Sequence, residues 1–171
     1  AYRETVTGAA EALNVFDLEI AGKRQYAGVR VRADGKLRGE GNCVEFSVPA
    51  AMIPPEFRSA VEQGIRDVLQ TGVLARYAIE DVRVAVTGGL YDVEASTEMA
   101  FRSAAVMATR EAIAAATPEL LEPIMKIEIT TPAEHMGDVL GDLNGRRGRV
   151  REMITRGSLQ VIRADVPLAE L

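Results

Sequence analysis

Apolar and polar residues alternate along residues 25–33 and again along residues 43–48. In the first run, Val29, Val31 and Ala33 occupy every second position and alternate with Gly28, Arg30 and Arg32. A period of two residues is typical of a strand that buries one face. We therefore predict half-buried strands at both places.

The period becomes helical after Pro54-Pro55. Apolar residues recur every three or four positions from Phe57 to Leu69, and Thr71-Gly72 ends the run. Proline suits the first turn of a helix, where its missing N–H has no partner to lose, and glycine is typical of the end. This stretch is predicted to be an amphipathic helix.

A further strand and a long helix follow. Val82, Val84 and Val86 alternate with other residues, and Gly88-Gly89 is expected to break that strand. The alanine-rich stretch from about residue 96 to 116 has the composition of a helix. Its methionines and phenylalanine are expected to lie in the core. The first part of the chain thus reads as several strands followed by helix, strand and helix.

A second unit is predicted to begin near Glu122-Pro123, because a regular alternation of apolar and polar residues runs from 124 to 130. We expect a capped helix next: Thr131 can accept from the amide of Glu134, which can reach back to the amide of Thr131. Two more strand-like runs follow.

These two runs, residues 150–154 and 159–166, give the order strand, helix, strand, strand. A complete split βαβ fold needs one more helix and strand. Because the sequence ends at Leu171, we expect this second domain to be truncated.

Composition narrows the class of protein. The 171 residues are 47% hydrophobic and 26% charged, which suits a globular chain with a modest core. The single cysteine, Cys43, favours a reducing, cytoplasmic setting, and no apolar run is long enough to span a membrane. The start, Ala1-Tyr2-Arg3-Glu4, is expected to lie inside a longer chain. The net charge of −5 means that any contact with RNA must come from local basic patches.

Several strings, spread in order over nearly the whole chain, resemble the elongation factor G family. They are AYRET (residues 1–5), IPPEFRSAVEQGI (53–65), STEMAF (96–101), LLEPIMK (120–126), MGDVLGDLNGRRGR (136–149) and QVIRA (160–164). The resemblance implies an α+β chain with two domains. Residues 1–121 would be domain IV, with the fold of the second domain of ribosomal protein S5, and residues 122–171 a truncated ferredoxin-like domain V.

The resemblance also implies a function. Domain IV of this family enters the A site of the small ribosomal subunit and supports movement of the tRNA–mRNA duplex, using two loops at its tip. The first loop corresponds to residues 21–28, in which the candidate RNA-binding residues are Gly22, Lys23, Arg24, Gln25 and Tyr26. Glycine permits close backbone approach, basic side chains meet phosphates, and tyrosine can stack on bases. Without the resemblance, the same residues would read as a solvated hairpin turn. Glycines typical of the family are replaced at Ala21, Arg24 and Ala27.

The second tip loop corresponds to residues 88–95, with Tyr91 and Asp92 as candidates. The family commonly has a histidine where this chain has Asp92. An aspartate would repel phosphate, although it can accept hydrogen bonds from bases or riboses. The alternative is that Asp92 only favours the turn. The difference suggests a paralogue that acts in ribosome recycling or in tetracycline ribosomal protection.

A second basic cluster lies in the second domain. It comprises Arg146, Arg147, Arg149, Arg151 and Arg156, of which the first four are the candidate binding residues. In one continuous strand, Arg147, Arg149 and Arg151 would project from the same face and form a ridge for phosphates. The resemblance implies rRNA contact near the sarcin-ricin loop and the stalk base, whereas composition alone would favour a solvated face.

Catalysis by this segment is not expected. The only histidine, His135, has no predicted nucleophile partner, and the sequence lacks a phosphate-binding loop. GTP, Mg²⁺ and GTP hydrolysis would belong to an N-terminal domain of the parent protein, which we expect to be monomeric. A remote alternative is a small ferredoxin-like phosphatase that uses Asn144 with Arg146 or Arg147.

Overall fold

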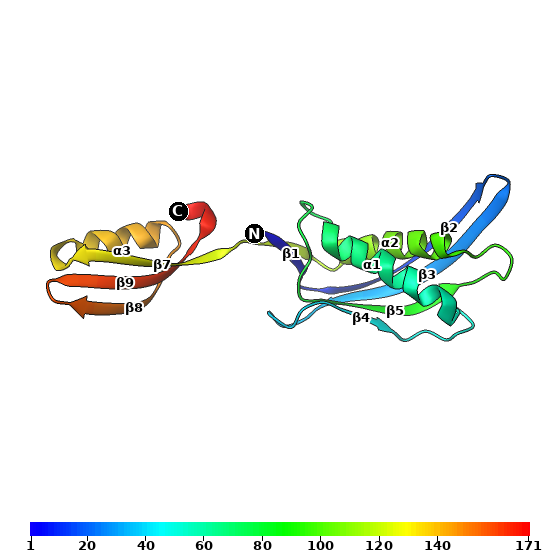
Figure 1. Cartoon of the computed structure of the whole chain (residues 1–171), viewed down its shortest axis with the longest axis horizontal. Helices are drawn as coiled ribbons and strands as arrows, with labels where there is room; N and C mark the ends of the chain where they lie inside the picture. The colour runs from blue at the N-terminus through cyan, green and yellow to red at the C-terminus, as the bar shows by residue number, and fades with distance from the viewer. The chain divides into compact units, whose positions relative to one another are not determined.

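The computed structural model describes all residues from 1 to 171, which form two compact units (Figure 1). Residues 2–121 make the first unit, and residues 122–171, with Ala1, make the second. Both units combine helices with largely antiparallel sheet, which confirms the predicted α+β class.

A four-stranded sheet in the order β2-β3-β5-β4 organises the first unit. Its strands are β2 (Ala9–Ile20), β3 (Lys23–Gly35), β4 (Cys43–Phe46) and β5 (Val82–Leu90). Neighbouring strands are antiparallel except β4, which runs parallel to β5. A separate antiparallel pair is formed by β1 (Arg3–Val6) and β6 (Pro118–Leu121), so the beginning and end of this unit lie side by side.

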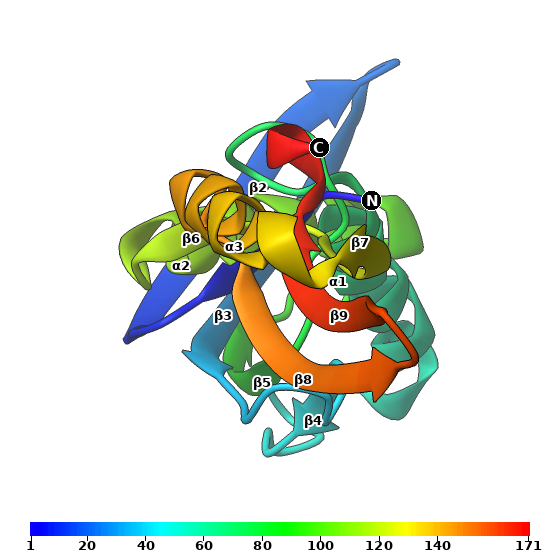
Figure 2. The same cartoon turned by 90° about the vertical axis from the view of Figure 1, so that its left-hand side faces the viewer.

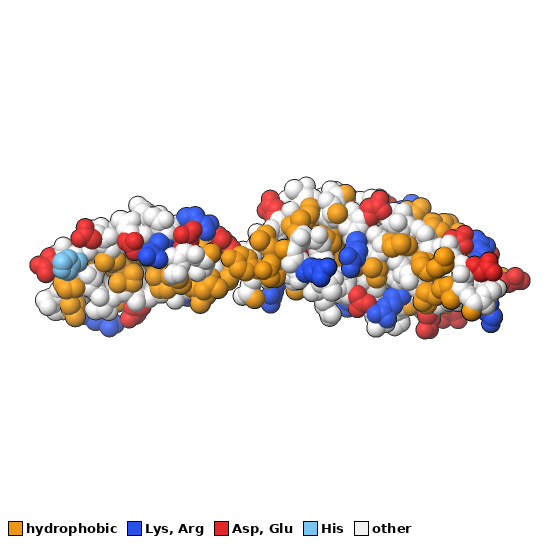
Figure 3. All heavy atoms as spheres, turned by 90° about the horizontal axis from the view of Figure 1, so that it is seen from above, with side chains coloured by type: hydrophobic (Ala, Val, Ile, Leu, Met, Phe, Trp, Pro, Cys, Tyr) orange, Lys and Arg blue, Asp and Glu red, His pale blue; other side chains and the backbone are white.

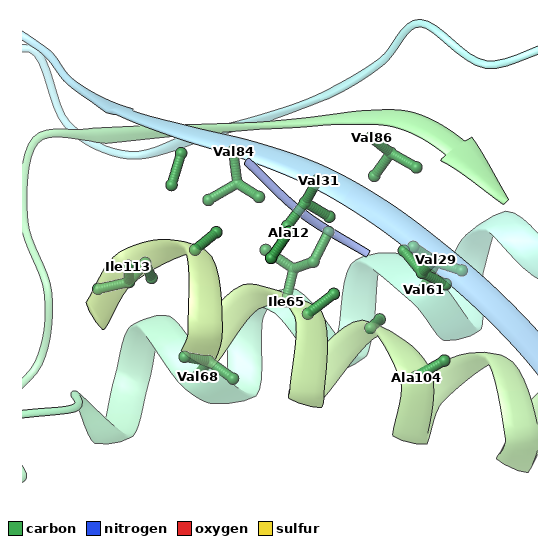
Figure 4. Packing of buried hydrophobic residues seen from close by; sticks show 14 of the residues in the cluster. Ala12, Val29, Val31, Val61, Ile65, Val68, Val84, Val86, Ala104 and Ile113 are labelled. Atoms are coloured by element: carbon green, nitrogen blue, oxygen red, sulfur yellow. The ribbon is translucent and has the colours of Figure 1, made fainter. Parts of the chain in front are cut away.

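Two helices cover one face of this sheet (Figure 1). They are α1 (Arg58–Thr71), which follows a short 3-10 turn (Pro55–Phe57), and α2 (Glu98–Ala115). Figure 4 shows valines of β3 and β5, such as Val31 and Val84, facing Ile65 of α1 and Ala104 of α2. All four side chains are completely buried. The alternation seen in the sequence therefore places one face of each strand in the core.

Glu4 of β1 is a fully buried acid, with 0% of its surface exposed. Its Oε1 accepts from the backbone N–H groups of Val73 and Leu74 at 2.7 and 2.8 Å, and its Oε2 from those of Ala75 and Tyr77, both at 3.0 Å. Burial raises the pKa of Glu4, but the four backbone donors outweigh this effect and hold the pKa below its ordinary value. One carboxylate thus fixes the segment that joins α1 to β5.

The second unit is a three-stranded antiparallel sheet with one helix on one face (Figure 2). The strands are β7 (Ile124–Pro132), β8 (Arg149–Arg156) and β9 (Leu159–Pro167), in the order β7-β9-β8. The helix is α3 (Met136–Gly145), with short 3-10 turns at Ala133–His135 and Leu168–Glu170. Leu143 of α3 packs against Ile162, Ala164 and Val166 of β9.

Two local predictions were wrong. Gly88 and Gly89 do not end β5, which continues to Leu90. A Cβ at Gly89 would lie 2.5 Å from Cγ1 of Ile53, so this glycine serves close packing against a neighbouring side chain. The capping box at residues 131–134 is not formed either. Thr131 is a buried residue of β7, one position before the strand ends, and its hydroxyl donates to the carbonyl of Pro132 at 3.3 Å. A 3-10 turn then precedes α3.

We expect Glu4→Gln to lower the free energy of unfolding by about 2–4 kcal/mol, because the new amide group would face backbone donors in a site closed to water. Urea unfolding measures the change. Glu80→Gln is the matched control: Glu80 pairs with Arg3 at 3.1 Å, but its side chain is 49% exposed. That control should change stability by less than about 0.5 kcal/mol. Equal unfolding midpoints for the two variants would contradict the structural role assigned to the Glu4 carboxylate.

The same contact makes stability depend on pH. Because the pKa of Glu4 is lower in the folded protein, its contribution is complete above the unfolded-state pKa of about 4.3 and is lost as pH falls through the folded-state pKa. The stability difference between the native chain and Glu4→Gln should therefore shrink with increasing acidity. A difference that stays constant over this range would be inconsistent with a buried carboxylate.

Candidate functional site

A long hairpin of β2 and β3 carries the first candidate segment (Figure 1). Pairing continues without a break up to Ile20 opposite Lys23, so only Ala21 and Gly22 form the turn, with φ of 51° and 79°. The prediction of an eight-residue loop was therefore wrong. Residues 23–28 belong to β3, because the pairing with β2 continues nearly to the end of the hairpin.

The second candidate segment, predicted as residues 88–95, begins only after β5 ends at Leu90 and extends over residues 91–97, which bind to the edge of β3. The backbone N–H of Tyr26 donates to the carbonyl of Ala95 at 2.9 Å, and the hydroxyl of Ser96 donates to the carbonyl of Tyr26 at 2.7 Å. The hydroxyl of Thr97 also donates to Oε1 of Gln25 at 2.5 Å. The two predicted tip segments are thus brought together, and both polar backbone groups of Tyr26 are satisfied between them.

Asp92 stabilises the turn of the second segment through hydrogen bonds within that segment. Its Oδ1 accepts from the backbone N–H groups of Glu94 and Ala95, both at 2.9 Å. Its own N–H donates to the hydroxyl oxygen of Ser96, also at 2.9 Å. The backbone donors, first Ala95 and then Glu94, lower the pKa of Asp92 below its ordinary value. One carboxylate oxygen is therefore engaged in the turn, as the alternative interpretation of Asp92 predicted.

Arg24 is paired within its own hairpin. Its Nε and Nη2 donate to the two carboxylate oxygens of Asp17 at 3.0 and 3.1 Å, and its Cζ lies 4.5 Å from the centroid of the Tyr26 ring. The hydrogen bond to Asp17 is the main cause that raises the pKa of Arg24, and it also lowers the pKa of Asp17. Sequence reasoning missed Asp17, because only the strand register shows that Asp17 lies close to Arg24.

The end of this unit is not basic overall. Among residues 17–26 and 91–97, the basic side chains are Lys23 and Arg24, whereas the acidic side chains are Asp17, Glu19, Asp92 and Glu94. Lys23 forms no ion pair. Figure 3 likewise shows basic and acidic side chains interspersed on the visible surface of each unit. Attraction to phosphate at this tip therefore depends on few groups.

Tyr91 occupies a different position from the other candidates. Its ring is half-buried against the hydrophobic core, with its centroid 5.9 Å from that of Phe57. Tyr26, by contrast, alternates with the core residues Ala27 and Val29 and therefore lies on the sheet face opposite the helices.

The candidate arginines of the second unit do not form the predicted ridge. Arg147 precedes β8 and has a φ of 55°, and a bulge at Arg151 interrupts the alternation of the strand. Arg146 pairs with Asp142, Arg147 with Glu122 and Glu170, and Arg151 with Asp165, while Arg149 is exposed. Three of the four arginines are thus bound to carboxylates of the same unit.

Another network in this unit was not predicted. Arg163 of β9 lies between Glu128 of β7 and Glu152 of β8, at 3.0 and 2.9 Å, on the face that α3 does not cover. These residues pair across three strands, so their proximity could be inferred only after the strand order was known.

The remaining candidate features are a histidine site, a metal site and a membrane-spanning helix. His135 is exposed and lies 3.6 Å from Glu134, as expected for a surface residue in the first turn of a helix. No cluster of three or more acidic, histidine or cysteine side chains is placed to hold a metal ion. None of the helices is both long and apolar enough to cross a membrane.

Asp92→Ala should loosen the second segment, because the backbone N–H groups of Glu94 and Ala95 lose their acceptor. We expect hydrogen exchange of these two amides to become about tenfold faster. Glu94→Ala is the control, since the exposed side chain of Glu94 makes no hydrogen bond in the structure. Unchanged exchange in Asp92→Ala would exclude this role for the carboxylate.

Comparison with known proteins places both units in one family. The description "Elongation factor G, domain IV" matches residues 1–117, and "Elongation factor G C-terminus" matches residues 119–171. A crystal structure from Thermus thermophilus is similar over 99% of this chain, with 36% sequence identity and a TM-score of 0.85, and the match covers 25% of that longer chain. The chain belongs to the elongation factor G family, of which it carries domain IV and C-terminal domain sequence.

Proposed function

We propose that this chain is the part of a translational GTPase that enters the A site of the small ribosomal subunit and supports movement of the tRNA–mRNA duplex. Family membership gives the class of protein. The observation that carries the specific role is the joined tip, in which residues 91–97 support the β2–β3 hairpin at Tyr26. Such support lets a narrow hairpin keep its shape when it meets a moving ligand.

The chemistry of the tip is compatible with RNA. Lys23 lies next to the turn and forms no ion pair, so it can meet a phosphate. The space around Gly22 is open, since a Cβ added there would meet no atom within 4 Å, and a ligand can therefore approach the backbone closely. Gln25 offers an amide nitrogen to RNA, since its Oε1 accepts from Thr97. Asp92 contributes by fixing the loop rather than by binding phosphate.

The remaining proposals concern the parent protein. GTP and Mg²⁺ would be bound, and GTP hydrolysed, by a domain outside these 171 residues, and the parent would act as a monomer in the cytoplasm. The C-terminal unit would contact rRNA near the sarcin-ricin loop and the stalk base through Arg149, the one of the four candidate arginines that is exposed and forms no ion pair. Arg146, Arg147 and Arg151 would first have to release their carboxylates.

The alternatives are a related ribosomal factor and a small phosphatase. A paralogue for ribosome recycling or tetracycline ribosomal protection would use the same ribosomal site, and Asp92, where the family commonly has a histidine, is the observation that favours it. The small phosphatase is less compatible with the geometry, because Arg146 and Arg147 are bound to acidic side chains and do not line an open anion site.

Lys23→Glu in the full-length parent should slow single-round translocation by about tenfold, because an acidic group would replace the unpaired cation beside the turn. Lys36→Glu is the matched control: Lys36 follows the far end of β3, away from the turn, and should leave the rate unchanged. Equal rates for the native parent and Lys23→Glu would rule out the proposed role of the hairpin.

Assays on the same full-length parent also distinguish translocation from ribosome recycling and from tetracycline protection. A parent that moves tRNA supports the proposal. A parent that instead splits ribosomal subunits or releases tetracycline, without moving tRNA, would contradict it and identify the corresponding paralogue.

A further inference from the structure

We infer that Arg24 and Tyr26 form a stacking platform for an unpaired nucleobase, and that Asp17 is the positioning residue that holds the platform in place. This inference rests on the proposed function, because it names the chemical group that the tip would recognise on RNA. It assigns Arg24 a role different from the neutralisation of phosphate.

The three side chains share one face of the hairpin. Tyr26 lies opposite Asp17 in the strand register, and Arg24 is two residues from Tyr26 on the same strand. The guanidinium carbon of Arg24 lies 4.5 Å from the ring centroid of Tyr26. A flat cation and an aromatic ring are thus held against each other on the face turned away from α1 and α2.

The hydrogen bonds of Arg24 restrict what it can still bind. Nε and Nη2 donate to both oxygens of Asp17, at 3.0 and 3.1 Å, so one donor edge of the guanidinium is occupied. The side chain nevertheless remains 53% exposed. Guanidinium planes and aromatic rings are the surfaces on which proteins stack unpaired bases. What Arg24 offers a ligand is therefore mainly its plane.

The charges around the platform argue against a phosphate site. Asp17 neutralises Arg24, and Glu19, which lies directly opposite Arg24 in the register, adds a further negative charge. Lys23 alternates with Arg24 and therefore projects to the other face of the strand. A phosphate would meet a net negative face here, whereas an uncharged base would not be repelled.

The platform is also supported from behind. Both polar backbone groups of Tyr26 are bound by the second segment, through Ala95 and Ser96. The backbone under the ring is therefore fixed before a ligand binds. Less conformational entropy is then lost on binding, because the site is already ordered.

Titration of the chain with a short oligouridylate, and with an abasic oligonucleotide of equal length and charge, tests the inference. NMR signals of the Arg24 side chain and of the Tyr26 ring report binding at the site itself. We expect both signals to shift with oligouridylate and to shift little with the abasic oligonucleotide. We also expect the affinity for oligouridylate to fall only weakly with salt, because few phosphates are neutralised.

Asp17→Asn separates stacking from charge attraction. This variant removes a negative charge and loosens the anchor of Arg24, so a phosphate site would bind more tightly, whereas the platform should bind oligouridylate several-fold more weakly. Arg24→Lys keeps the charge and removes the plane, and we expect the preference for oligouridylate over the abasic oligonucleotide to fall about tenfold. Lys36→Ala, just beyond the far end of β3, is the control and should keep that preference.

Three results would overturn the platform: equal binding of both oligonucleotides, tighter binding by Asp17→Asn, or no shift of the Arg24 and Tyr26 signals with oligouridylate. These results are independent of the translocation assay. A parent that translocates while the chain binds both oligonucleotides equally would exclude the platform alone. A parent that does not translocate would contradict the proposed function, and the oligonucleotide comparison would still decide whether the platform exists.

Discussion

The register between β2 and β3 is the constraint on which the first unit depends. Because pairing runs continuously from Ala9 opposite Asp34 to Ile20 opposite Lys23, every side chain of the hairpin is assigned to one of two faces. One face places Val29 and Val31 in the core beneath the helices. The other carries Asp17, Glu19, Arg24 and Tyr26 of the tip. A shift by a single residue would exchange these faces and remove both the core and the candidate site.

Acidic side chains at several places organise backbone instead of remaining in solvent. Glu4 accepts four backbone N–H groups, and Asp92 accepts two. Asp81 does the same for Gly39 and Gly41, at 3.1 and 2.8 Å. Such carboxylates contribute to the net negative charge without forming an acidic binding surface. At the tip, this arrangement leaves Lys23 as the basic side chain that can attract an anion.

Sequence reasoning identified the family, the α+β class and the strands that bury one face. It did not predict β2, because apolar residues lie on both of its faces: Leu13 and Val15 are exposed, while Ala12 is buried. It placed a loop over part of β3, because the family resemblance implied one at residues 21–28, and it ended β5 too early, because Gly88-Gly89 suggested a break. It also could not pair Asp17 with Arg24 or Ser96 with Tyr26. These contacts depend on register and on tertiary packing, which local periodicity does not contain.

In the proposed function, the supported hairpin is the part of the parent protein that meets RNA in the A site of the small subunit. A cryo-electron microscopy structure of the parent, bound to a ribosome that carries tRNA and mRNA, would observe this contact directly. We expect density for residues 20–26 against the tRNA–mRNA duplex, with residues 91–97 still bound to Tyr26. A complex in which this hairpin points away from RNA, or in which the two segments separate, would contradict the proposed role.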